Sequence, residues 1–582
     1  MADARDLEKI LTSVPMNRRM LLKRAAILGA SAPVIGSLLA ACEDDDADDD
    51  EPAVEPDDDV DDDVEPDDDE PDDDVPADEE DRYGGEIVAL GHHEIESLSP
   101  DDQGPTVHWT MITNIHDALV DVDWQFEIEN ELAREYEISD DGLEYTFHLQ
   151  EDVLFHDGEP FTSDDVRYTW EFHADPDNGT IQHGNFMNVD SVETPDEHTA
   201  IVHMAEPDAS LLRGACRIGI VPEHHHGEIG EDAYKSDPIG TGPFYVDEYS
   251  PAEFCRLAAY EDHWRGRPYV DFFTERIIPE GSVRTIELQA GDADVIVWPP
   301  VIDDVIEMLE DPNIRSYWCL TQSVNHISFN NTHEVLSDRA VRQAAFYATD
   351  RQQIIDDVFL GAAEVAHSNL VHTLEPYFYE DVHRYEYDPE RAEEILEEAG
   401  WVMGDDGVRE KDGVRCEWVC QVITGDQARL PQAEATQAYL AAVGINMEIE
   451  EAPFATIQEN QREGNIGSGL YNWSHGGWMG EPDMSSELHS GARNNFHRFY
   501  NDRVDELIEE GLQLVETEDR VPVYHEIQEI VADEAAFLYF SFWEWYGQWS
   551  TRIQGLPEET DGQQTSNLLL HVRNYWIDPD QR

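Results

Sequence analysis

Residues 141–166 read DGLEYTFHLQEDVLFHDGEPFTSDDV and contain a turn, a strand, a second turn and the start of a helix. Residues 140–142 supply the first turn signal, and apolar residues then alternate with polar ones up to Leu149, as in a half-buried strand. After the second turn, Thr162 and Asp165 have the spacing of a helix capping box. The stretch therefore predicts a strand, a turn and a capped helix in succession.

Further short blocks continue in the same direction along the chain. They are PIGTGPF at 238–244, HWRGRPYVD at 263–271, AGDAD at 290–294, FNN at 329–331, DRAVRQA at 338–344, YATDR at 347–351, DPERA at 388–392 and AGW at 399–401. Together with residues 141–166, in this order, they resemble the signature of the family 5 extracellular solute-binding proteins. That family comprises the dipeptide, oligopeptide and nickel binders of ABC importers.

The blocks also have physical readings of their own. Asp388 is a good N-cap, Pro389 suits the first helical position, and Gly400 can end the helix in a left-handed conformation. A second helix is expected from Ala433 to Val443 and feeds an alternating strand, Ile445 to Glu450. A helix end is expected from Ile115 to Val120, and a strand from Val414 to Ile423. Repeated helix-then-strand order indicates an α/β architecture.

The resemblance implies two α/β lobes of the periplasmic-binding-protein type, which close on ligand by hinge bending, with an extra subdomain in the first lobe. We expect residues 84–323 to form lobe I with its subdomain and residues 324–540 to form lobe II. Residues 541–582 would then return to lobe I. A ligand would lie between the lobes, and the closed form would deliver it to a membrane permease.

The N-terminal segment predicts export. Arg18 and Arg19 precede an apolar run, residues 25–41, which is broken by Gly and Pro and is at the lower limit for a membrane span. The pair resembles a twin-arginine signal, and the Leu-Ala-Ala-Cys ending at Cys42 resembles a lipobox, in which the cysteine is lipidated. The alternative is an amphipathic N-terminal helix with arginines by chance. We expect residues 1–42 to be the signal and the protein to be anchored at the outer face of the cell membrane.

The segment after the signal is a predicted disordered tether. It spans residues 43–82, and 27 of the residues from Glu43 to Asp81 are Asp or Glu, so it has almost nothing to bury. The whole chain has 35 basic and 131 acidic residues and a formal net charge of -96, which excludes a nucleic-acid partner. Such self-repulsion is tolerable where salt screens it, so we expect an extreme halophile, an archaeon, as the source.

Residues 470–483, LYNWSHGGWMGEPD, are the predicted ligand loop. Trp473 and Trp478 offer flat apolar surface, and Glu481 and Asp483 add carboxylates, a combination that suits a small-ligand cleft. In the peptide-binding members, the carboxylate of an Asp-Pro pair holds the ligand's amino terminus, and Glu481-Pro482 stands at that pair here. The alternative is that the two acids only orient the loop.

No catalytic or metal site is expected. His224, His225 and His226 are interpreted as an exposed loop rather than a metal site, and the five cysteines after Cys42 as buried thiols. Motifs of hydrolases, metalloproteases and phosphate-binding loops are absent from the sequence. We therefore expect a monomeric peptide binder without a cofactor, whose partners are its ligand and an ABC permease. Nickel complexes or oligosaccharides are the alternative ligands, and an exported hydrolase is the alternative class.

Overall fold

The computed structural model describes residues 79–102, 106–123, 127–296, 302–309, 311–424, 426, 428–473, 482, 484–557 and 565–582. The predicted signal with Arg18, Arg19 and Cys42, and the tether up to residue 78, lie outside them. The tether was expected to extend to residue 82, but Glu79–Arg82 form a 3-10 helix, η1. Its Arg82 guanidinium lies 4.5 Å from the centre of the Trp576 ring, which ties this segment to the folded part.

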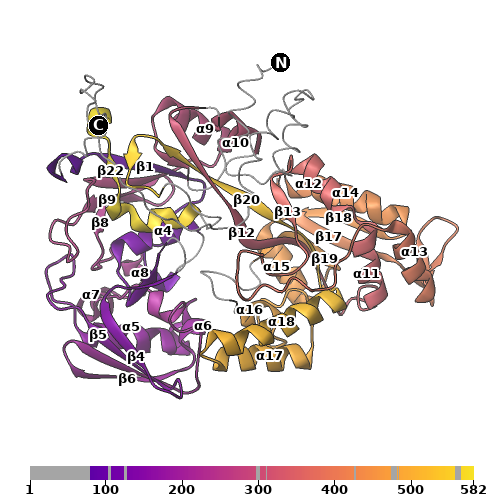
Figure 1. Cartoon of the computed structure of the whole chain (residues 1–582), viewed down its shortest axis with the longest axis horizontal. Helices are drawn as coiled ribbons and strands as arrows, with labels where there is room; N and C mark the ends of the chain where they lie inside the picture. The colour runs from indigo at the N-terminus through magenta and orange to yellow at the C-terminus, as the bar shows by residue number, and fades with distance from the viewer. Residues whose placement is uncertain are drawn as a thin grey trace, which may run out of the picture.

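Eleven strands of the described chain form one sheet that runs through both halves of the molecule (Figure 1). Lobe I contributes one end of this sheet, with helices beside it. Its strands are β1 (Glu86–Gly91), β8 (Phe244–Ser250), β9 (Phe254–Ala259), β10 (Phe272–Ile277) and β11 (Val295–Ile296); its helices are α4 (Thr106–Ile115), α9 (Gly281–Ala290), α10 (Ile302–Met308) and the 3-10 helix η5 (Thr565–Asn574).

The extra subdomain is a separate antiparallel sheet of four strands in the order β4-β5-β7-β6. It lies at the lower left of Figure 1 and is coloured in indigo and purple. Its elements are β4 (Ala133–Ile138), β5 (Glu144–Leu149), β6 (Val189–Asp196), β7 (Thr199–Met204), α5 (Ser163–Ala174), α6 (His183–Phe186), α7 (Glu223–Ile229) and α8 (Glu231–Tyr234). This confirms the fold class, two α/β lobes with a subdomain beside the first.

Lobe II holds the other end of the large sheet and most of the helices. Its strands are β13 (Ala363–Val365), β17 (Glu417–Ile423), β18 (Asn446–Ala452) and β19 (Ser468–Trp473). Its helices are α11 (Arg339–Ala348), α12 (Arg351–Val358), α13 (Pro389–Glu398), α14 (Arg429–Ala442), α15 (Phe454–Glu463), α16 (Ser485–Leu488), α17 (Asp502–Gln513) and α18 (Thr517–Glu534).

Small elements complete the described part of the chain. They are β2 (Val120–Val122), β3 (Ile128–Asn130), β14 (Val402–Met403), β15 (Arg409–Lys411), β16 (Val414–Arg415), β21 (Ile553–Gln554), β22 (Trp576–Ile577), and the 3-10 helices η2 (Pro100–Asp102), η3 (Pro176–Asn178), η4 (Ala215–Arg217) and η6 (Pro579–Gln581). None of the helices in the described residues is long and apolar enough to cross a membrane.

Two long strands belong to both lobes. β12 (Ile314–Phe329) and β20 (Leu538–Ser550) pair in antiparallel fashion along most of their length and cross the middle of the molecule (Figure 1). Their register shifts midway, because β12 advances from Leu320 to Val324 while β20 goes only from Glu544 to Phe542. This irregularity is a bulge, which bends and twists the paired strands between the lobes.

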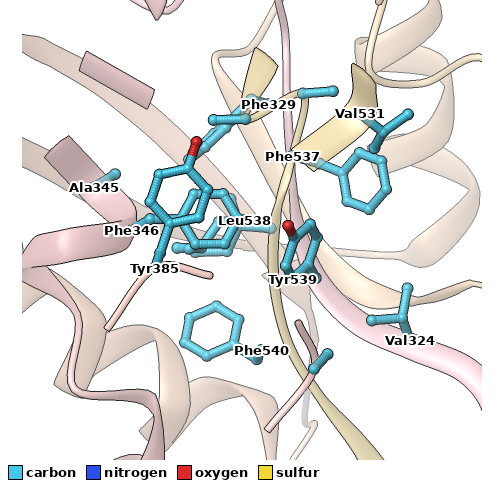
Figure 2. Packing of buried hydrophobic residues seen from close by; sticks show 14 of the residues in the cluster. Val324, Phe329, Ala345, Phe346, Tyr385, Val531, Phe537, Leu538, Tyr539 and Phe540 are labelled. Atoms are coloured by element: carbon cyan, nitrogen blue, oxygen red, sulfur yellow. The ribbon is translucent and has the colours of Figure 1, made fainter. Parts of the chain in front are cut away.

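The core of lobe II is the largest apolar cluster of the described residues. Around the start of β20 it is rich in aromatic rings, among them Phe537, Tyr539 and Phe540 (Figure 2). Phe346 of α11 stacks on Tyr385 with ring centres 4.4 Å apart. Lobe I and the subdomain each have a smaller core of their own. Burial of apolar surface, at about 25 cal/mol per Å², holds each unit together.

Local signals in the sequence correctly mark most of the predicted elements. The main-chain N–H of Thr162 donates to Asp165 Oδ2 at 2.9 Å at the start of α5, which is the predicted capping box. The side chain of Asp388 caps α13, and Gly400 has a φ of 91°. Two of the wrong predictions concern helices. The segment from Ile115 to Val120 is not helical throughout, because α4 ends at Ile115 and Val120 begins β2.

The second wrong prediction concerns the three consecutive histidines. They lie in helix α7 rather than in an exposed loop, and His226 is fully buried. The His226 ring bonds Asp101 through Nε2 at 2.9 Å and the Tyr168 hydroxyl through Nδ1 at 2.8 Å. These two hydrogen bonds compensate for the hydrogen bonds to water that the imidazole loses on burial. His226 thus connects the subdomain to η2.

Candidate functional site

The strand directions place the carboxyl ends of both half-sheets opposite each other. In lobe I, β1 is parallel to β10 and β11, and in lobe II β17 is parallel to β18 and β19. β12 runs in the same direction as β11, and its Ser316 is level with Ile296, the last residue of β11, because both pair with Gln548 of β20. β12 runs antiparallel to β19, and its Val324 pairs with Trp473, the last residue of β19. Each set of strands therefore ends toward the other lobe, on either side of residues 317–324. We call these two ends the facing edges.

Ligands of open α/β sheets bind beyond the carboxyl ends of the strands, so the facing edges define the candidate site. On the lobe I edge, β1 is followed by His92 and His93, whose ring centres are 3.7 Å apart. Burial, with help from His93 and Arg284, lowers the pKa of His92 to about 3, so this imidazole is neutral at physiological pH. The lobe I edge thus holds a neutral imidazole, that of His92.

Trp473 is the last residue of β19 and lies on the lobe II edge. It was expected in a loop, but it pairs with Val324 of β12, and its indole N–H donates to Glu487 Oε1 at 2.8 Å. The Phe496 ring packs edge-on against it at 5.4 Å. The indole is half-buried and its N–H is already used, so only the apolar ring surface is left for a ligand. The other predicted site residues, Trp478, Glu481 and Asp483, lie outside the described residues.

Arg429 is a site residue that the sequence analysis missed. It begins α14 beside the carboxyl end of β17, and its side chain pairs with Asp426 and donates through Nη2 to Asn472 Oδ1 at 2.9 Å. The guanidinium lies 4.7 Å from the centre of the Trp543 ring. Asp426 also accepts from Arg429 N at 2.8 Å, just before the helix. An Asp at this place, a residue type common before helix starts, was a signal that the helix begins before Ala433.

The lobe II edge thus holds a fixed cation, Arg429, and an aromatic ring, Trp473. Asn472, which accepts from Arg429, precedes Trp473 in β19, so the two side chains point to opposite faces of the strand and the ring against the guanidinium is that of Trp543. A guanidinium held in this way can recognise a carboxylate, and the ring surface can accept apolar groups of varied shape. The edge is therefore suited to a ligand that carries both an anionic and an apolar part.

Two cavities lie elsewhere. One of about 640 Å³ in lobe II is lined by Arg351, Glu364 and His367 among others, and one of about 580 Å³ in lobe I by His156 and Asp157 among others. Neither contains a predicted site residue. Among the described residues, no three His, Cys, Asp or Glu side chains are grouped to hold a metal ion. The five cysteines of the described chain are buried thiols, as expected.

A two-lobed sheet with facing carboxyl edges defines a binding protein that takes its ligand between the lobes. Solved structures share this fold. The oligopeptide-binding protein AppA of Bacillus subtilis, in complex with a nonapeptide, matches with a TM-score of 0.74 and 23% identity, over 85% of this chain and 99% of AppA. NikZ of Campylobacter jejuni, in complex with Ni(L-His), matches with a TM-score of 0.75 and 23% identity, over 84% and 99%.

Sequence comparison agrees with the fold. Residues 127–496 match the bacterial extracellular solute-binding proteins, family 5. The chain is 30% identical to heme-binding protein A of Haemophilus influenzae over 464 residues, which cover 75% of this chain and 83% of the relative. It is 25% identical to AppA over 514 residues, covering 85% and 92%. The protein therefore belongs to family 5 of the extracellular solute-binding proteins. It is the non-enzymatic, solute-binding component of an ABC transporter.

Proposed function

We propose that this protein captures di- or oligopeptides outside the cell and delivers them to a membrane permease by closing its lobes. Structural relatives support a peptide ligand: AppA is solved with a nonapeptide, DppA of Helicobacter pylori with the peptide STSA, and a dipeptide-binding protein of Pseudoalteromonas with Met-Leu. The register shift of β12 near residues 321–323 supports a hinge at this crossing.

The observation that carries the proposal is the presence of a fixed guanidinium, Arg429, and an aromatic ring, Trp473, on the lobe II edge. A peptide is a zwitterion with apolar side chains, so it needs a cationic group, an anionic group and adaptable apolar surface. Arg429 suits the ligand's carboxylate and Trp473 its side chains. We assign the amino terminus to Glu481, with Trp478 and Asp483 in the same loop, because a carboxylate shielded from water can pair with an ammonium group.

The test is calorimetry in high salt with a tripeptide and its N-acetylated form. Removing one partner of a buried pair costs about 3 to 5 kcal/mol, so Glu481→Gln should weaken the free-amino tripeptide more than about 100-fold. The N-acetylated form should lose far less. Glu434→Gln, an exposed acid of α14, is the matched control and should change neither. Equal losses for both peptides would exclude the amino-terminus role, and no binding by the native protein would exclude peptides.

Heme is a second candidate ligand, because the relative at 30% identity is a heme-binding protein. Titration of the purified protein with hemin, followed by the Soret absorbance, separates the two candidates. A saturable shift that tripeptide does not reverse would favour heme over peptide. Nickel complexes, which NikZ binds, and oligosaccharides are tested by calorimetry in the same way.

We propose further that Cys42 is a lipid anchor, that Arg18 and Arg19 direct export, and that the protein comes from a halophilic archaeon. The signal-like ending at Cys42 and the net charge of -96 support these proposals. Release of a Cys42→Ser variant into the medium tests the anchor. Loss of the circular-dichroism signal on dialysis to about 0.1 M salt tests the halophilic character, because surface repulsion is then unscreened over about 10 Å.

A further inference from the structure

The subdomain of lobe I touches lobe II at a second place, away from the β12–β20 crossing. The main-chain N–H of Ala209 donates to the carbonyl of Leu512 at 2.8 Å. Next to this bond, a Cβ placed on Gly142 would lie 3.3 Å from Val515 Cγ2 and 3.3 Å from Pro207 Cβ, so the three residues are in contact. Figure 1 shows the subdomain beside α17 and α18, below the crossing strands.

Both sides of this contact are rigid. In the subdomain, Asp208 Oδ1 accepts from the main-chain N–H and the hydroxyl of Ser210, and Asp208 Oδ2 accepts from Asn188 Nδ2 at 3.2 Å. In lobe II, Arg520 Nε donates to Gly511 O at 3.2 Å, which fixes the end of α17 against α18. A contact between two fixed surfaces loses little conformational entropy when it forms.

The hydrogen bond from Ala209 also supplies a donor to a carbonyl that has no partner within α17. The last four carbonyls of an α-helix have no intrahelical partner, and Leu512 is next to the last residue of α17, Gln513. Its carbonyl finds its donor on the other lobe, 303 residues away in sequence. The carbonyl of Leu512 at the C-terminal end of α17 therefore has this donor only when the subdomain is in contact with lobe II.

We propose that Gly142, Pro207 and Ala209 of the subdomain, with Leu512 and Val515 of lobe II, form a latch that holds the lobes closed without ligand. One main-chain hydrogen bond with a small apolar contact shifts an equilibrium about 3- to 10-fold. The latch lowers the free energy of the closed state whatever the ligand is, so it slows solute exchange. The inference rests on the two-lobed fold and not on the proposed peptide ligand.

The experiment measures the ratio of closed to open molecules in the ligand-free protein by single-molecule energy transfer in high salt. Dyes are attached at Asp190→Cys in β6 and Glu529→Cys in α18, two exposed positions, in a Cys42→Ser background. The five described cysteines are buried and do not compete for dye. Val515→Asp places a carboxylate in the apolar contact with Gly142 and Pro207 and should lower the closed-to-open ratio about 10-fold. Val515→Ala should lower it about 3-fold.

Val283→Asp is the matched control, because Val283 of α9 is 40% exposed and Val515 is 42% exposed. Val283→Asp adds the same charge away from the contact, and it should leave the closed-to-open ratio within about twofold of the native value. Circular dichroism of each variant checks the fold. The proposal is overturned if the ligand-free native protein has no closed population, or if Val515→Asp behaves like Val283→Asp. Because no ligand is present, either result leaves the peptide proposal untouched.

Discussion

The two lobes differ in the charged groups that they bury most deeply. Among the described residues, the carboxylates that are at most 2% exposed all lie in lobe I; they are Asp101, Asp117, Glu275 and Asp294. Guanidinium groups that are at most 4% exposed occur in both lobes: Arg342, Arg351, Arg409 and Arg520 in lobe II, and Arg217 and Arg284 in lobe I. Burial raises the pKa of Glu275, whereas for Asp101 and Asp117 burial is outweighed by hydrogen bonds from His226 and His263, which lower the pKa of each carboxyl. Lobe I should therefore respond to pH through Glu275, and the buried guanidinium groups should stay charged.

The buried arginines of lobe II act as cross-links between main-chain segments. Arg351 donates from Nη1 to the carbonyls of Ala366 and Tyr539 and from Nη2 to the carbonyl of Tyr385 at 2.7 Å. Burial lowers the pKa of Arg351 only to about 10, so it stays charged at pH 7. Three carbonyls from separate segments thus depend on one side chain.

The largest expected effect is that of Arg351→Met, which should lower the free energy of unfolding by about 3 to 5 kcal/mol. The substitution keeps the apolar stem but leaves three buried carbonyls without a donor. Arg391→Met is the control, because its partner Glu394 is 65% exposed and the pair is on the surface; it should cost under about 1 kcal/mol. Chemical denaturation measures both variants. Equal, small losses would show that lobe II does not depend on its buried cations.

A smaller effect is expected in lobe I from Asp101→Asn, about 2 kcal/mol. Asp101 accepts from His226 at 2.9 Å and faces His173 at 3.5 Å, and all three side chains are almost inaccessible. A carboxylate can accept from both histidines, whereas an amide has only one oxygen and can accept from one of them. Hydrogen bonds to charged groups contribute about 1.5 to 3 kcal/mol to stability, which sets the size of the expected loss. Asp102→Asn, at the half-buried neighbour that pairs with Lys235, should cost under about 1 kcal/mol. If Asp101→Asn leaves the thermal unfolding temperature unchanged, this role of Asp101 is contradicted.

The last expected effect is a pH dependence due to Glu275. Its carboxyl is fully buried in lobe I, neither oxygen has a hydrogen-bond partner among the described residues, and burial raises its pKa well above the ordinary value. The folded state therefore keeps a proton that the unfolded state releases above about pH 4.3. Stability should fall by about 1.4 kcal/mol per pH unit above that value, until the folded carboxyl itself ionises.

Glu275→Gln should remove this slope and make the protein more stable at pH 7 than the native chain. Glu248→Gln, at an exposed position in β8 of the same sheet, should keep the native slope. Denaturation at several pH values between 5 and 8 gives the comparison. If Glu275→Gln retains the native pH dependence, the buried carboxyl is not its source, and the contrast between the lobes is weaker than proposed.

The sequence predicted elements that depend on residues close together in the chain. The capping box of Thr162 and Asp165 marks α5, and Asp388, Pro389 and Gly400 bound α13, because caps and turns are set within a few residues. The family resemblance then supplied the two-lobed fold, which no single block implies.

Features that depend on distant partners were missed or placed wrongly. His226 looked like part of an exposed loop, since its partner Asp101 is 125 residues away. The strand expected from Val414 to Ile423 is instead two strands, separated at Cys416. The first, β16, pairs with β15, and the second, β17, pairs with β18. Arg429 and the contact of Ala209 with Leu512 likewise become visible only when strands and helices from different parts of the chain come together.

The position of β20 in the chain also governs how the protein is made. This strand pairs with β11 in lobe I, with β13 in lobe II, and with β12 in both, yet it begins only at Leu538. During synthesis, the strand that joins the two half-sheets is missing until nearly the whole polypeptide has emerged from the ribosome, so one edge of β11, one edge of β12 and β13 stay unpaired until then. Stable folding of either lobe is consequently a post-translational event, and a nascent chain arrested after Phe537 should show neither lobe protected from proteolysis.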